Sequence, residues 1–182
     1  SMTGGLANEG RAILGGDVSL ELIQRQVSEQ EQAFLQGTGA QITEIADLRG
    51  MARTSDEQNQ TVVEIKAVDA PYPMVSDLTF VDDAGVLRSD LHDALAEENG
   101  VFGLLAEGTL TARLDVQIGD VIRIGEHAYE LRGVIEREPD RLSSGFGFGP
   151  RAMMSRAGLE ASELVQPGSL VEWEYTLAFP QA

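Results

Sequence analysis

The chain contains no cysteine among its 182 residues, which excludes structural disulfides, thiolate catalysis and zinc sites built from cysteine. It also lacks any apolar run near the roughly eighteen residues of a membrane helix, and its first residues lack the basic and apolar regions of a signal peptide. Read literally, these absences predict a soluble, unexported protein. The pair Ser1-Met2 is typical of a cloning remnant, however, so the chain also fits a soluble piece of a larger membrane protein whose membrane segments lie outside it.

Basic residues are scarce as well, because 13 lysines and arginines stand against 30 acidic residues and give a formal net charge of -17. A charge of this sign repels phosphate backbones and anionic headgroups, so we expect no nucleic-acid partner. The acidic residues are spread along the chain without long blocks, which predicts a solvated surface rather than an acidic binding tail. Hydrophobic residues make up 42% of the chain, enough for one ample core or two small subdomains.

Residues that carry chemistry are few. His92 and His127 are the only histidines, and they show no metal-binding spacing. Ser143 and Ser144 lie outside any GxSxG elbow, and the glycine-rich residues 145–149 lack the spacings of nucleotide-binding loops. We therefore predict no catalytic, cofactor-binding or metal-binding residues, and we expect that the chain itself is not an enzyme.

The first third of the sequence predicts a strand-helix-strand-strand unit. Residues 1–16 are glycine-rich and indicate a flexible lead-in, and residues 18–25 then alternate as a strand. Ser28 and Glu31 have the spacing of a capping box, so a helix should begin there and end near Gly37 and Gly39. A bent strand is expected over residues 41–54 and an alternating strand over residues 61–68. The prolines at 71 and 73 then indicate a subdomain boundary.

The middle of the chain predicts short elements that end in a clear hairpin. Residues 119–140 begin with a Gly-Asp turn, continue as a strand over 121–124, and return as an alternating strand that stops before Pro139. Upstream we expect a strand at 77–81, a helix that begins after Ser89 or Asp90 and stops at Asn99-Gly100, a buried strand at 101–106, and one or two helical turns with Leu110 and Leu114 on one face.

The last third contains a loop and the most regular strand. Residues 141–149 form the loop, in which Phe146 and Phe148 cannot obviously both be buried; with Arg141 they make the candidate partner-contact loop. A strand at 151–154 and a short helix capped by Ser155 follow. Residues 169–179 alternate with five large apolar side chains on one side, so this strand should pair back with the first unit. The middle would then be an insertion.

The strongest clue to function is the order of several stretches. They are GGDVSLELIQRQVSEQEQAFL, LRGMART, VVEIKAVDAPYP, IGDVIRIG with LRGVIEREPD, GFGFGPRAMMS and LVQPGSLVEWEYTLAFP, and they cover most of residues 11–180. In this order they resemble the MacB-like extracytoplasmic core domain of FtsX-like ABC transporter permeases, in particular the YbbP-type branch. Each motif alone is weak, whereas the order is specific.

The resemblance implies an α+β fold, in which a porter-like strand-helix-strand-strand unit (residues 17–69 plus about 150–182) is completed by the C-terminal strand and interrupted by a smaller β-rich subdomain (about 70–149). It implies a periplasmic or extracytoplasmic domain of an inner-membrane permease. Such a domain would lie between two transmembrane helices and couple the ATP-driven movement of those helices to a periplasmic protein or a lipid- or lipoprotein-related substrate, with a cytoplasmic ATPase as a separate subunit. No cofactor or catalytic residue is implied. The alternatives are a free-standing periplasmic binding module and a lipid or ester hydrolase.

Overall fold

The computed structural model describes residues 18–23, 25–73, 77–139 and 149–179. Within these ranges the fold is mixed α+β, as predicted, with strands outnumbering helices. Helices are α2 (Glu29–Gly37), α3 (Leu91–Leu95), α4 (Gly108–Leu114) and α5 (Arg156–Ser162). Strands are β1 (Val18–Ile23), β2 (Gln41–Thr54), β3 (Gln60–Val68), β4 (Thr79–Val81), β5 (Leu87–Arg88), β6 (Glu97–Glu98), β7 (Val101–Ala106), β8 (Val121–Ile124), β9 (His127–Arg137), β10 (Arg151–Ser155) and β11 (Val171–Ala178).

Six of the strands close into a ring. β2 pairs with β3, β3 with β10, β10 with β7, β7 with β9, β9 with β8, and β8 returns to β2. The ring is a small barrel, which removes open edges from these strands. Strands from both predicted subdomains contribute to the barrel, and the division at residues 70 and 149 stays a prediction.

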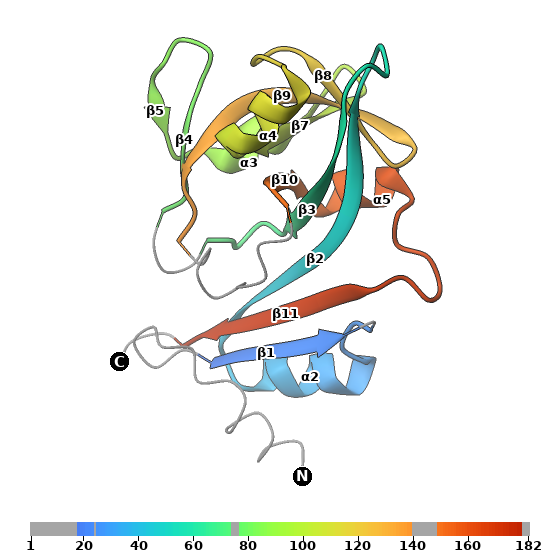
Figure 1. The fold of residues 1–182 in the computed structure, drawn as a ribbon. Helices are drawn as coiled ribbons and strands as arrows, with labels where there is room; N and C mark the ends of the chain where they lie inside the picture. The colour runs from blue at the N-terminus through green and yellow to red at the C-terminus, as the bar shows by residue number, and fades with distance from the viewer. Residues whose placement is uncertain (1–17, 24, 74–76, 140–148, 180–182) are drawn as a thin grey trace.

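The remaining strands extend the sheet beyond the barrel. At one end β2 continues past the barrel and pairs with β11, which in turn pairs with β1. At the other end β9 pairs with β4 and β4 with β5. Figure 1 shows β1, β11 and α2 at one end of the molecule and the β4–β5 hairpin at the other.

The predicted return of the C-terminal strand is confirmed. β11 lies antiparallel between β1 and β2, and Val18 at the start of β1 is opposite Leu177 near the end of β11. The start of β1 and the end of β11 therefore lie side by side. The apolar alternation ends at Leu177, however, because Phe179 lies beyond the strand and is 43% exposed.

The predicted helix caps at Ser28 and Ser155 are confirmed, whereas Asp90, at the N-cap of α3, makes no capping hydrogen bond through its side chain. Ser28 Oγ accepts from the amide of Glu31 at 3.2 Å, and Glu31 Oε1 accepts from the amide of Ser28 at 2.9 Å, so α2 begins with a capping box. Ser155 Oγ accepts from the amide of Gly158 at 3.0 Å at the start of α5. On α2, Leu35 is buried whereas Phe34 is exposed.

The expected stop at Asn99-Gly100 is wrong. α3 already ends at Leu95, and Asn99 and Gly100, with φ of 54° and 82°, form the turn of a hairpin between β6 and β7. Two consecutive left-handed residues match the twist of a tight hairpin, so this pair serves as a strand turn here rather than a helix end.

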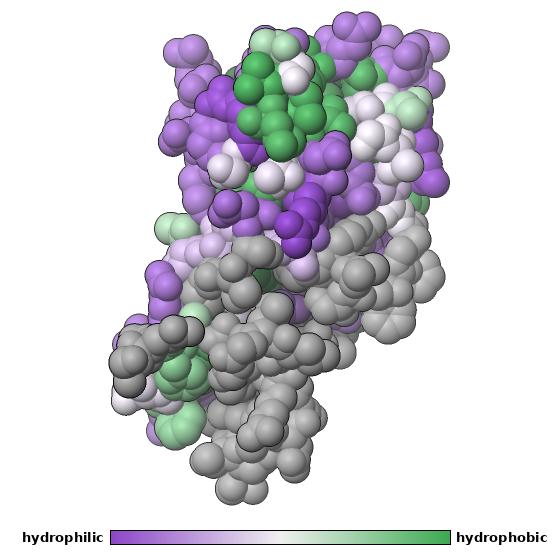
Figure 2. Space-filling model, turned by 90° about the vertical axis from the view of Figure 1, so that its left-hand side faces the viewer, coloured by the Kyte–Doolittle hydropathy of each residue, from purple (hydrophilic) through white to green (hydrophobic). Residues whose placement is uncertain are grey.

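The β4–β5 hairpin was only half predicted, because β5 has two residues and no alternation to detect. Its apolar residues Val86 and Leu87 are 54% and 58% exposed. Figure 2 shows an apolar patch with hydrophilic atoms around it at the end of the molecule where this hairpin lies.

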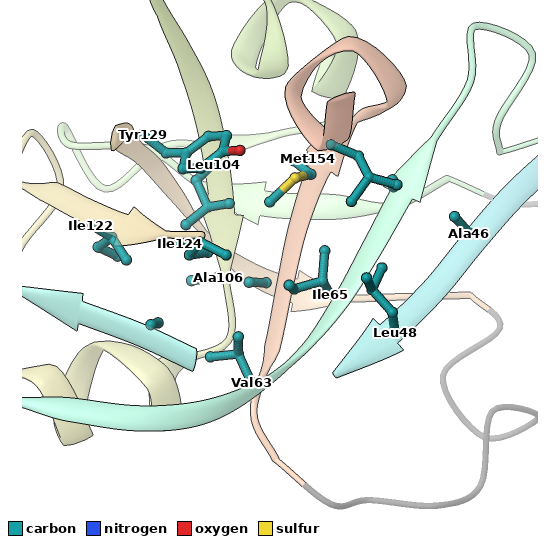
Figure 3. Close-up of a cluster of buried hydrophobic side chains, with 14 of the residues drawn as sticks. Ala46, Leu48, Val63, Ile65, Leu104, Ala106, Ile122, Ile124, Tyr129 and Met154 are labelled. Carbon is teal, nitrogen blue, oxygen red and sulfur yellow. The ribbon is translucent and has the colours of Figure 1, made fainter. Parts of the chain in front are cut away.

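Two apolar cores lie on opposite faces of the barrel strands. The larger fills the inside of the ring and continues along the same face of β2 and β11, and Figure 3 shows its central part, with Val63, Ile65, Leu104 and Met154 directed toward one another. The smaller lies outside the ring beneath α3 and β4. Its members are Ile45, Val68, Tyr72, Leu78, Phe80, Leu91, Leu95, Leu105 and Met153.

Candidate functional site

The face of β3 that is directed away from the inside of the barrel carries charged side chains that are buried. The alternation of residues 61–68 puts Glu64 and Lys66 on the face opposite Ile65, and in the structure these two charged residues are only 8% and 3% exposed. Arg151, in the neighbouring strand β10 and opposite Glu64 in register, is 0% exposed. Buried charges persist only where they are paired, so this face must contain an ionic network.

Glu138 is the centre of that network. Its Oε1 accepts from Arg151 Nε at 3.0 Å, and its Oε2 accepts from Lys66 Nζ at 3.0 Å. Lys66 Nζ also donates to the hydroxyl of Tyr72 at 3.0 Å and lies 4.5 Å from the centre of that ring. Each oxygen of one buried carboxylate thus meets a different cation.

Two further carboxylates complete the network. Arg151 Nη1 lies 3.4 Å from Asp47 Oδ2 and 3.5 Å from Glu64 Oε2. Burial raises the pKa of Asp47 above its ordinary value, and the charge of Arg151 opposes that rise. We call Asp47, Glu64, Lys66, Glu138 and Arg151 the ionic cluster.

The ionic cluster lies at the base of the predicted partner-contact loop. Glu138 precedes residues 140–148 and Arg151 follows them, so their ion pair joins the two flanks of this segment. The flank after it is also fixed to the barrel, because the amide of Arg151 donates to Glu107 Oε1 at 2.7 Å. Arg141, Phe146 and Phe148 themselves lie outside the described residues, as do Ser143 and Ser144.

A second polar group lies near the β1–β11 end of the molecule and was missed by sequence reasoning. Glu44 accepts from the hydroxyl of Tyr175 at 2.6 Å and from Gln26 Nε2 at 3.2 Å, and it forms an ion pair with Arg156. The Tyr175 hydroxyl also accepts from the amide of Val27 at 3.0 Å. The available signal was Tyr175 on a buried strand face, because a buried tyrosine hydroxyl needs a partner.

The surroundings of Glu44 are shaped by burial. Asp69 Oδ2 accepts from the amide of Glu44 at 2.6 Å, and burial raises the pKa of Asp69 above its ordinary value. The guanidinium of Arg156 stacks over Trp173 at 4.7 Å from the ring centre. A shallow hollow of about 360 Å³ lies beside this group, lined by Glu44, residues 26–29 and the polar side of α2.

The two histidines, His92 and His127, contact groups of the protein rather than one another. His92 Nε2 lies 2.5 Å from the carbonyl oxygen of Tyr72, and the ring of His127 packs edge-on against Phe102 and Tyr129. Within the part of the chain that the structure describes, no group of three His, Asp or Glu side chains could hold a metal ion. Nor does any helix among these residues have the length and apolar character needed to cross a membrane.

No protein-family model matches the chain, but comparison with known proteins finds a relative of it. The uncharacterized ABC transporter permease YbbP of Escherichia coli strain K12 is 30% identical over 177 residues, which is 96% of this chain and 20% of YbbP. The chain thus spans about a fifth of that relative's length.

Two solved structures share the fold. The extracellular domain of the noncanonic ABC-type transporter YknZ from Gram-positive bacteria has a TM-score of 0.55 at 14% identity, over 90% of this chain and 84% of that one. The periplasmic region of MacB from Actinobacillus actinomycetemcomitans has a TM-score of 0.51 at 11% identity, over 90% and 75%. The chain is therefore homologous to part of the permease YbbP, and it shares its fold with the extracytoplasmic domains of the ABC transporters YknZ and MacB.

Proposed function

We propose that this domain is the non-catalytic extracytoplasmic part of a permease and couples ATP-driven movement of membrane helices to an extracytoplasmic substrate or partner. The observation that carries the proposal is the pairing of β1 with β11. Because Val18 lies opposite Leu177, the chain enters and leaves the sheet at the same place, which suits a domain attached to two neighbouring membrane helices. The flanking helices and a cytoplasmic ATPase subunit are part of this proposal.

The path of coupling follows β2. Residues 41–48 of this strand pair with β11, and residues 52–54 pair with β8 in the barrel. A strand of 14 residues extends over about 45 Å, and it belongs to both ends of the molecule. A displacement applied at β1 and β11 would therefore move the barrel as one body.

For the movement to act on a substrate or a partner protein, some part of the domain must contact that molecule. We propose the loop with Arg141, Phe146 and Phe148 for this role, because two phenylalanines on a loop suit an apolar ligand and the ionic cluster fixes both flanks of the loop. A lipid- or lipoprotein-related substrate is the class that fits apolar side chains, and an extracytoplasmic protein is the alternative within the same proposal.

Location and movement are testable in the full-length permease, reconstituted with its ATPase subunit and cleared of other cysteines. A cysteine at exposed Ala84 should react with a membrane-impermeant maleimide in spheroplasts, whereas a cysteine at Leu105, which is 0% exposed, should react only after unfolding. The distance between a label at Ala84 and one in a flanking membrane helix should differ between the ATP-bound and nucleotide-free states. Absence of surface labelling would overturn the location, and an unchanged distance would overturn the coupling.

A further inference from the structure

The β4–β5 hairpin exposes the aliphatic pair Val86 and Leu87 on a rigid support. Asp82 Oδ1 accepts from the amides of Ala84 and Val86, each at 2.9 Å, and the amide of Asp82 donates to the carbonyl of Val86 at 3.0 Å. The base of the hairpin is held by Phe80, which is 1% exposed in the smaller core. The two aliphatic side chains are therefore fixed in solvent, where they cost free energy unless something covers them.

The rim of this patch is acidic. Asp82 and Asp83 precede the pair in the turn, and Asp90 and Asp93 follow it. Arg88 is the one lysine or arginine between Asp82 and Asp93. It forms ion pairs with Asp82, at 3.5 Å, and with Asp90, so its positive charge is already paired. Hydrogen bonds to these carboxylates lower the pKa values of Asp82 and Asp90, so both stay ionised at neutral pH.

The acidic residues around the exposed aliphatic pair determine, by their charge, which kind of molecule can bind there. A second copy of the chain would bring the same acidic rim against this one, on a molecule of formal net charge -17, and an anionic lipid surface would be repelled in the same way. β5 has only two residues, so it offers little edge for strand addition, and side-chain contact must supply the binding.

We propose that residues 79–93 form a docking surface for a protein partner that presents aliphatic side chains flanked by lysine or arginine. The inference rests on the proposed function only in placing the partner outside the cytoplasm. Val86 and Leu87 provide the apolar contact, and the four aspartates provide orientation and a fast encounter, because complementary charge acts mainly on the association rate. The hairpin lies at the end of the molecule opposite β1 and β11, away from the attachment to the membrane that we propose (Figure 1).

Peptide binding to this chain tests the proposal without the membrane or the ATPase. The probes are three peptides of eight residues, with Lys-Val, Lys-Ser and Glu-Val repeats, titrated at two salt concentrations. The chain should bind the Lys-Val peptide about tenfold more tightly than the Lys-Ser peptide of equal charge, and the Glu-Val peptide should not bind. The double variant Val86→Ser/Leu87→Ser should lose the tenfold preference and keep the weak charge-driven binding.

Leu170→Ser is the matched control, because Leu170 is 73% exposed and lies outside the hairpin. It should bind all three peptides like the unchanged chain.

Asp83→Asn/Asp93→Asn should weaken Lys-Val binding and reduce its salt dependence. Equal binding by the unchanged chain and the Val86→Ser/Leu87→Ser variant would overturn the proposal. Concentration-dependent dimerisation through the hairpin, or hairpin-dependent binding to anionic vesicles, would overturn it in favour of another occupant. Failure of the labelling experiment in the permease would leave this peptide result intact, so the two proposals can fail separately.

Discussion

Arg151 and Glu138 form a fully buried ion pair, with Arg151 Nε 3.0 Å from Glu138 Oε1 and side chains that are 0% and 2% exposed. The pair connects the flank of β9 to β10, and Lys66 binds the other oxygen of the same carboxylate. Replacing one partner of such a pair is more damaging than its net contribution suggests, because the remaining charge stays buried without compensation.

Arg151→Met should therefore destabilise the domain strongly. The substitution preserves much of the side-chain volume but leaves Glu138, Asp47 and Glu64 facing each other with Lys66 as the remaining cation of the cluster. We expect a loss of about 3–5 kcal/mol in the free energy of unfolding, measured by urea denaturation at pH 7. Arg25→Met is the control, since Arg25 is 53% exposed and its ion pair with Glu31 is screened by solvent. Equal effects of the two substitutions would contradict the role assigned to the cluster.

The ionic cluster also shows where sequence reasoning ends. Alternation located β3 correctly, and Ile65 and Ala67, which it puts on one face of the strand, are buried. The same alternation puts Lys66 on the other face of the strand, and it gives no sign that this face is buried as well. The group that covers Lys66 is Glu138, 72 positions away in the sequence, and no local pattern reports such a partner. The closing of the barrel by β8 was missed for the same reason, because a four-residue strand gives no sign that it pairs on both sides.

Turn chemistry and capping were predictable, because their hydrogen bonds lie within a few residues. The Ser28–Glu31 capping box and the hairpin at Gly125 are examples. Of the candidate site, the sequence predicted only the loop with Arg141, Phe146 and Phe148, which stays a prediction. The Glu44 group depends on Tyr175, which is 131 positions away, and was beyond the reach of local patterns.

Tyr129→Phe should reduce stability at neutral pH and remove one source of alkaline unfolding. The Tyr129 hydroxyl donates to the carbonyl of Gly158 at 2.6 Å inside the barrel, and its loss leaves that oxygen without this donor, at a cost of about 1–3 kcal/mol. Burial raises the pKa of Tyr129 to about 12. The stability that depends on its neutral form is present below the ordinary value of 10 and is lost as pH rises through 12.

The measurement is urea unfolding of both proteins at pH 7, 10 and 11.5. The difference between the unchanged chain and Tyr129→Phe should narrow at the highest pH, where ionisation penalises only the tyrosine. A constant difference across this range would show that the hydroxyl is solvated in the folded state.

Asp69→Asn should flatten the dependence of stability on pH in the acidic range. Burial raises the pKa of Asp69, so the folded state holds its proton more tightly than the unfolded state does. The stability linked to the neutral carboxyl is present below the ordinary pKa of 3.8 and is lost as pH rises through the raised value. Relative to the unchanged chain, the asparagine variant should gain stability between pH 3.5 and 7, because an amide oxygen still accepts from Glu44 and carries no charge. Thermal unfolding over this pH range measures the gain, and a parallel pair of curves would exclude the shift.

Two glycine substitutions should act in opposite directions. A Cβ at Gly103 of β7 would lie 1.8 Å from the carbonyl oxygen of Ala94 and 2.7 Å from Arg132 Nη1, so α3 would have to move away from the barrel. Arg132 holds this contact, since its Nη1 donates to the Ala94 carbonyl at 3.1 Å and its Nη2 to the Val101 carbonyl at 3.0 Å. Because a backbone atom rather than a flexible side-chain end is in the way, Gly103→Ala should cost about 1–3 kcal/mol or more.

Gly37→Ala places the same methyl group where nothing lies within 4 Å, at the end of α2. Alanine restricts the unfolded chain more than glycine does and favours helix, so this variant should gain up to about 1 kcal/mol. The two alanine variants differ only in what surrounds the added carbon, and chemical denaturation of both against the unchanged chain isolates that difference. A Gly103→Ala variant as stable as Gly37→Ala would mean that α3 does not pack against β7 in solution. Leu91 and Leu95 of α3 share the smaller core with Phe80 at the base of the β4–β5 hairpin. That result would therefore also contradict the support of the hairpin by this core.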